Sequence, residues 1–134
     1  GFEHWEDALD LMTDCFLKVL GESGTLIVPT FNWDFCSGKP FEYEKSPSQV
    51  GMFSNHILFN RISVRSLNPI LSFAAIGPHA DTLFKDLSNS CYSKNSVYQR
   101  LHAINAKLIF FNITYHFECL INIIILIFWT FLVA

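Results

Sequence analysis

Charge is scarce in this chain of 134 residues, and no run of lysine or arginine occurs in it. Charged side chains make up 16% of the sequence, and the formal net charge is −3. Proteins that bind nucleic acid usually carry a basic patch or stripe that neutralises phosphates. The composition therefore argues against nucleic acid as a partner.

Cysteine and histidine are present, but they are not clustered. The four cysteines and five histidines are scattered, and none has the spacing of a zinc site or a recognisable triad. No secretory signal stands at the start of the sequence. We therefore predict no metal site, free thiols, and a cytoplasmic location, in which disulfides are rare.

Apolar residues, by contrast, are abundant. Hydrophobic residues make up 51% of the chain, which includes 14 phenylalanines. Much of this excess lies in the last third of the sequence. A chain of this length suffices for one domain with a real core, but not for two.

Hydrophobic periodicity predicts helices that alternate with strands. The expected helices span residues 5–20, 53–60, 79–87 and 97–105, and the expected strands span residues 25–28, 71–76 and 107–113. Ser96 and Gln99 form a capping box for the last helix. Each strand is apolar throughout, so we predict an α/β fold with a sheet covered on both faces.

Three short blocks carry the residues that suit ligand binding. They are VPTFNWDF at residues 28–35, SPSQVG at residues 46–51, and RSLNPILSFAAIG at residues 65–77. Each places turn residues beside polar groups and aromatic rings, as ligand-contacting loops do. Asp34 beside Trp33 suits an amino group, although these two residues could instead form a turn and pack beneath the loop. Arg65 and Ser66 are candidate donors to phosphate or carboxylate groups.

The order and spacing of the three blocks resemble the aminoglycoside 3-N-acetyltransferase family. The resemblance implies acetyl transfer from acetyl-CoA, as a substrate, to an amine of an aminoglycoside or a related aminosugar. It also implies a fragment of a three-layer α/β/α domain with a mixed or parallel central sheet. On this basis we expect acetyl-CoA to bind at Thr30, Ser48, Val50, Gly51, Arg65 and Ser66. We expect the acceptor to bind at Phe31, Trp33, Asp34 and Asn68.

The resemblance fails near the C-terminus, so we divide the chain into a partial acetyltransferase-like domain (residues 1–118) and an apolar tail (residues 119–134). In the family, a T-F-I-H-like motif supplies the histidine that is expected to act as general base. An ungapped alignment puts Asn122 at that position, and asparagine is no base near neutral pH. Family members also begin upstream of Gly1, with a serine-containing segment that binds the cofactor. We therefore predict that acetyl transfer is impaired or lost in this chain.

The tail allows three interpretations. It is short for a membrane-spanning helix, which needs about 20 apolar residues. It could instead be an apolar helix or strand of the core, or it could lie outside the selected protein sequence, as the product of a frameshift would; we favour the last. The alternative function is accordingly a non-catalytic remnant, or a binding fragment that is tethered to a membrane through residues 119–134.

Overall fold

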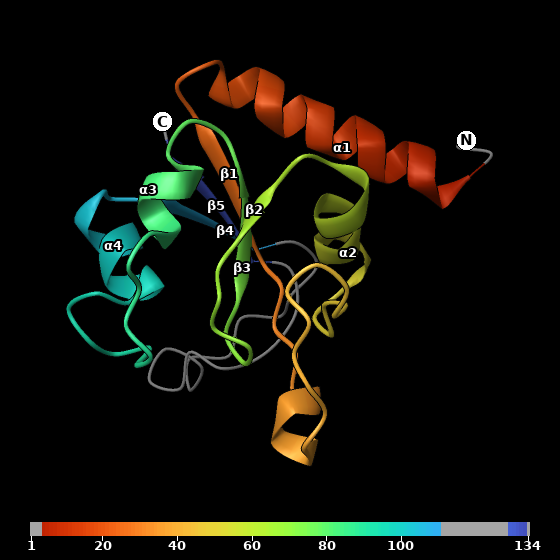
Figure 1. Cartoon of the computed structure of the whole chain (residues 1–134). Helices are drawn as coiled ribbons and strands as arrows, with labels where there is room; N and C mark the ends of the chain where they lie inside the picture. Colours follow the sequence, from red (N-terminus) through yellow and green to blue (C-terminus); the bar gives the residue numbers. More distant parts are fainter. Residues whose placement is uncertain (1–3, 111–128, 134) are drawn as a thin grey trace.

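The computed structural model describes residues 4–110 and 129–133 (Figure 1). Its helices are α1 (Trp5–Leu20), α2 (Met52–Asn60), α3 (Ala80–Phe84) and α4 (Val97–Ala103), with a short 3-10 helix, η1 (Asp34–Ser37). Its strands are β1 (Thr25–Pro29), β2 (Val64–Arg65), β3 (Phe73–Ile76), β4 (Lys107–Phe110) and β5 (Trp129–Val133). The strands form one sheet in the order β2-β3-β1-β5-β4.

The predicted first helix is confirmed, and its ends follow from local chemistry. Acidic residues occupy the first turn of α1, where the helix dipole favours negative charge. The helix ends at Gly21, whose φ of +66° is readily adopted by glycine and whose N–H donates to the carbonyl of Leu17. α4 begins at the predicted cap, since the Ser96 side chain accepts a hydrogen bond from the N–H of Gln99.

Every strand pairing that the structure describes is antiparallel. β1 lies between β3 and β5, β2 pairs with β3, and β4 pairs with β5. The prediction of a mixed or parallel sheet is therefore wrong for these strands. That prediction followed from the family resemblance, and the apolar strands agreed with it, because strands buried on both faces are typical of parallel sheets. All five residues of β1 are indeed buried, but between antiparallel neighbours.

Helices cover both faces of the sheet, as predicted. Figure 1 shows α1 and α2 on one side of the strands and α3 and α4 on the other. Alternate residues of β1 point into two separate clusters. One contains Leu26 and Val28 with residues of α1 and α2, and the other contains Ile27 with residues of α3 and α4. The sheet therefore divides the core into two clusters, one on each face.

The last strand was among the interpretations of the tail, although it was not the favoured one. β5 pairs with β1 through Leu132 and Leu26, and with β4 through Phe131 and Leu108. Of the three interpretations of the tail, a strand of the sheet describes residues 129–133. Residues 119–128 lie outside the described residues, so the domain boundary after residue 118 stays a prediction. Among the helices that the structure describes, none is long and apolar enough to span a membrane.

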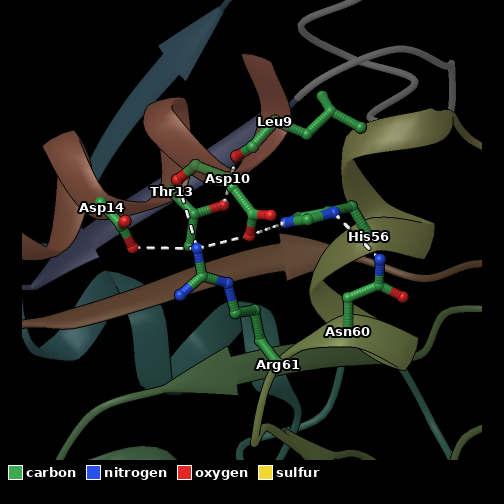
Figure 2. Close-up of polar contacts among 7 residues, drawn as sticks. All are labelled: Leu9, Asp10, Thr13, Asp14, His56, Asn60 and Arg61. Atoms are coloured by element: carbon green, nitrogen blue, oxygen red, sulfur yellow. Dashed lines mark hydrogen bonds and ion pairs between the residues drawn. The ribbon is translucent and has the colours of Figure 1, made fainter. Parts of the chain in front are cut away.

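A polar cluster ties α1 to α2 (Figure 2). The Asp10 carboxylate accepts a hydrogen bond from Arg61 Nη2 over 2.6 Å and lies 3.2 Å from His56 Nε2. The second contact has the distance of an ion pair but not the angle of a hydrogen bond. Arg61 Nη2 also lies 2.9 Å from Asp14 Oδ1. The His56 side chain is fully buried, so one exposed carboxylate of α1 holds both a buried ring of α2 and the cation that follows it.

We expect Asp10→Ala to lower the free energy of unfolding by about 1–2 kcal/mol, because Arg61 and His56 lose a partner and stay largely buried. Asp14→Ala is the matched control, since its side chain is 62% exposed and its loss leaves the bond between Asp10 and Arg61 intact. The control should cost about 0.5 kcal/mol or less. Urea denaturation measures both variants, and equal losses would show that Asp10 is not the centre of the cluster.

Candidate functional site

The first and third sequence blocks meet at one end of the sheet. β1 ends at Pro29 and β3 begins at Phe73, and the antiparallel register pairs these two residues. The N–H of Thr30 donates to the carbonyl of Ser72 over 2.8 Å. In return, Ser72 Oγ donates to the carbonyl of Thr30 over 2.6 Å. The two blocks are therefore joined by direct hydrogen bonds.

The second block lies alongside the first. The N–H of Gln49 donates to the carbonyl of Phe31 over 2.8 Å, and Gln49 Oε1 accepts from the N–H of Trp33 over 2.9 Å. Asn32 Nδ2 donates to the carbonyl of Pro47 over 2.9 Å. Two amide side chains thus hold the segment predicted to bind the acceptor next to the segment predicted to bind acetyl-CoA.

An asparagine of α2 fixes the second block. The N–H of Ser48 donates to Asn55 Oδ1 over 2.7 Å, and Asn55 Nδ2 donates back to the carbonyl of Ser48 over 2.8 Å. The N–H of Val50 donates to Ser48 Oγ over 3.2 Å, and both residues are buried. Gly51 caps α2 with a φ of +137°, which favours glycine. The position of this loop is therefore set by the start of α2.

The polar side chains predicted to bind acetyl-CoA are largely bonded within the protein. Arg65 and Ser66 are buried. Ser66 Oγ accepts from the N–H of Phe73 over 2.9 Å, and Thr30 Oγ1 shares a hydrogen bond with Ser72 Oγ over 3.0 Å. The Arg65 guanidinium donates to main-chain carbonyls of the first and second blocks. These groups hold the blocks together in the structure.

Two of the residues predicted to bind the acceptor, Trp33 and Asp34, are more open. Trp33 is half-buried, and its ring stands edge-on to the buried ring of Phe31 with centroids 6.2 Å apart. Asp34 starts η1, and its N–H donates to Asn32 Oδ1 over 2.9 Å. Its carboxylate is 39% exposed and lies 3.4 Å from Lys39 Nζ. An exposed pair of this kind is worth about 0–1 kcal/mol, so another cation can replace the lysine at small cost.

Asn68 lies at a small pocket between the third block and the segment before α4. Its Oδ1 accepts from the N–H of Leu71 over 3.2 Å, and its Nδ2 donates to Cys91 Sγ over 3.7 Å. Burial raises the pKa of the Cys91 thiol and also that of the Tyr98 hydroxyl. That hydroxyl is buried without a hydrogen-bond partner among the described residues. Both groups therefore stay protonated at neutral pH, so neither is suited to act as a base there.

The remaining sequence predictions concern thiols, metals and the base. Cys15, Cys36 and Cys91 are free thiols. In residues 4–110 and 129–133, no group of three His, Cys, Asp or Glu side chains is arranged to hold a metal ion. Asn122, which the ungapped alignment puts at the position of the family's base, lies outside the described residues, so that prediction is not tested.

Sequence reasoning missed several residues that hold the site together, namely Tyr43, Gln49, Asn55 and Ser72. Ser72 is the only polar residue in the predicted strand 71–76, so that strand is not apolar throughout, and the interruption was an available signal. Tyr43 and Gln49 lie in a long loop without a hydrophobic period. Asn55 lies within a predicted helix, and nothing in the hydrophobic pattern indicated that its side chain bonds the main chain of Ser48.

Together, the fold and the site define a mixed α/β domain in which loops at one end of the sheet gather turn residues, aromatic rings and a carboxylate. The chain matches the model of the aminoglycoside 3-N-acetyltransferase family over residues 2–120, and it belongs to that family. The resemblance carried by the three blocks is thereby confirmed. Members of this family are acetyl-CoA-dependent acetyltransferases that act on aminoglycosides. Comparison with curated proteins gives no match.

Proposed function

We propose that this chain carries part of its family's acetyl-transfer site, and that transfer is impaired or lost in it. The reaction moves acetyl from acetyl-CoA to an amine of an aminoglycoside or a related aminosugar. The observation that carries the proposal is the direct bonding of the three blocks at one end of the sheet, in a member of this family. The described unit is then a fragment of a three-layer α/β/α domain, with helices over both faces of the sheet.

The acceptor side of the proposed site is the segment after β1. An aminosugar carries protonated amines and hydroxyl groups, and the partly exposed carboxylate of Asp34 suits a protonated amine. Trp33 offers a ring to the sugar and to the cation, with Phe31 packed beneath it. Asn68 can both donate and accept hydrogen bonds. These four residues supply charge, a ring wall and a polar group for the acceptor.

The acetyl-CoA side of the proposed site is the second block with the strand ends beside it. Gly51 has no side chain, so a ligand can approach its backbone closely. Thr30, Ser48, Val50 and Ser66 are buried, and the hydrogen bond from the N–H of Val50 to Ser48 Oγ shapes the loop before Gly51. The pantetheine arm of acetyl-CoA is extended and suits such a backbone-lined edge.

The missing part of the proposed site is the general base. The acceptor amine is mostly protonated at neutral pH, so a positioned base must take a proton before or during the attack on the thioester. An ungapped alignment puts Asn122, which lies beyond the matched residues 2–120, where the family's histidine is expected, and its amide cannot take that proton. General-base catalysis is worth about 10²–10⁴ in rate. A chain that still binds its ligands should therefore transfer acetyl slowly.

We expect Asn122→His to raise the rate of acetyl transfer at least about tenfold over the wild-type chain, because it restores a base. Asn122→Gln is the matched control, since it keeps an amide, and it should leave the rate near background. Release of the free CoA thiol, with acetyl-CoA and kanamycin as substrates, measures all three. Fast transfer by the wild-type chain would contradict the proposed impairment. If no variant transfers acetyl and none binds acetyl-CoA, the proposed function is wrong.

A further inference from the structure

Arg65 carries a buried positive charge that a role in binding phosphate does not explain. Its side chain is 3% exposed, and burial lowers the pKa of the guanidinium from its ordinary value. Among the described residues, no carboxylate lies within ion-pair distance of it. Burying an unpaired cation is costly, so its donors must have good acceptors elsewhere.

All but one of those acceptors, Ser72 Oγ, lie at the two ends of one loop, residues 30–46. Arg65 Nη2 donates to the carbonyl of Thr30 over 2.9 Å and to Ser72 Oγ over 3.3 Å. Arg65 Nη1 donates to the carbonyls of Ser46 and Tyr43 over 2.6 and 3.1 Å. Its remaining donor, Nε, is buried without a partner among the described residues. Arginine has five N–H donors, and the geometry leaves none of them exposed to an incoming phosphate.

The same loop also contacts the arginine through its own side chains. The Tyr43 hydroxyl donates to the carbonyl of Arg65 over 2.8 Å and accepts from its N–H over 3.0 Å. The ring of Phe41 lies 4.7 Å from the guanidinium carbon, within the range of a cation–π contact. Residues 41–46 therefore wrap around the Arg65 side chain.

We propose that Arg65 is a positioning residue for the acceptor arm, which we define as residues 31–45, and not a ligand of the CoA phosphates. One guanidinium binds the carbonyls of Thr30 and Ser46, and these two residues flank the arm that carries Trp33 and Asp34. The inference rests on the proposed function, in which this arm binds the aminosugar. The acetyl-CoA side has anchors that do not involve Arg65, namely the two hydrogen bonds between Ser48 and Asn55 of α2. Loss of the hydrogen bonds from Arg65 to Thr30 and Ser46 should thus weaken binding of the acceptor but not of acetyl-CoA.

The test compares three variants by calorimetric titration with acetyl-CoA and with kanamycin. Arg65→Lys keeps the charge but lacks the planar fork that reaches both carbonyls. Tyr43→Phe removes only the hydroxyl that bonds the arm to Arg65, in a residue that is partly exposed and should fold normally. Arg100→Lys is the matched control, because Arg100 also donates to main-chain carbonyls, those of Leu83 and Lys85 near the end of α3.

We expect Arg65→Lys and Tyr43→Phe to raise the dissociation constant for kanamycin about tenfold while that for acetyl-CoA changes less than about twofold, since only the arm loses its preorganisation. Arg100→Lys should change neither. If Arg65→Lys weakens acetyl-CoA instead and Tyr43→Phe does nothing, Arg65 is a phosphate ligand and the proposal is overturned.

A readout without ligand separates this inference from the proposed function. Tryptic cleavage after Lys45, followed by mass spectrometry, should be several-fold faster in Arg65→Lys and Tyr43→Phe than in the wild-type chain and Arg100→Lys. Lys45 is 77% exposed at its side chain, so the order of the arm governs its cleavage. If the wild-type chain binds neither ligand, the proposed function fails. Unchanged cleavage in both Arg65→Lys and Tyr43→Phe would overturn the proposal that Arg65 positions the acceptor arm.

Discussion

Gly77→Ala is expected to lower the free energy of unfolding by about 3–5 kcal/mol, because strain and overpacking act together at this position. Gly77 follows β3 with a φ of +134°, a conformation that L side chains rarely adopt. A Cβ there would lie 2.4 Å from the carbonyl oxygen of Gly24 and 2.7 Å from Thr25 Cα. These are backbone atoms at the start of β1, so relief requires β1 and β3 to separate.

The matched control is Gly38→Ala. Gly38 also has a positive φ, +79°, but nothing lies within 4 Å of the added carbon. Only the conformational strain remains, and it should cost about 1–2 kcal/mol. Chemical denaturation monitored by circular dichroism compares the two variants. Equal losses of unfolding free energy in the two variants would show that the close approach of β1 and β3 at Gly77 does not add to the cost of Gly77→Ala.

Phe73→Ala is expected to cost about 3–5 kcal/mol of unfolding free energy, as truncation of a fully buried aromatic side chain does. The Phe73 ring is 0% exposed and stands edge-on to the rings of Phe31 and Tyr98, with centroids 5.3 and 5.4 Å away. The residue also opens β3 at the end of the sheet where the blocks meet. Its loss should therefore loosen the site as well as the core.

Phe35→Ala removes the same side chain from an exposed position and serves as the comparison. Phe35 is 51% exposed, beside the acceptor residues. We expect a change within about 0.5 kcal/mol, which is typical of surface substitutions. Thermal unfolding of both variants measures the difference. A loss at Phe35 as large as that at Phe73 would contradict the described packing.

Local signals in the sequence were enough to predict the helices α1 to α4 and the strands β1 and β3, but not η1 or β2. Apolar residues at helical spacing predicted α1, and Gly21 predicted its end, which is where the helix ends in the structure. Ser96 caps α4, as predicted. Such features depend on residues a few positions apart, so one sequence suffices to find them.

Sheet direction and the short strands could not be predicted in the same way. The burial of β1 on both faces is compatible with parallel and antiparallel neighbours alike, because helices can cover either kind of sheet. β2 has two residues and no period to detect. β5 lies in a continuous apolar run that offers no boundary signal. Pairing between distant segments decides these features, and residue spacing does not record it.

For the site, the sequence predicted which blocks matter but not how their polar groups are used. Arg65 and Ser66 were expected to face a ligand, yet their side chains bond to the protein's own main chain. A donor that binds a phosphate and a donor that binds a carbonyl have the same sequence signature. The structure adds which acceptors lie within reach, and this is the basis of the proposal that Arg65 holds the protein's own loop.

The most direct test of the account is the map of amide chemical-shift changes when acetyl-CoA is titrated into the isotope-labelled wild-type chain. The account predicts saturable changes that gather in residues 28–35, 46–51 and 65–77, with little change along α1. A folded chain that shows no saturable change, or changes centred on α1 and α2, would contradict the claim that these three blocks form the ligand site.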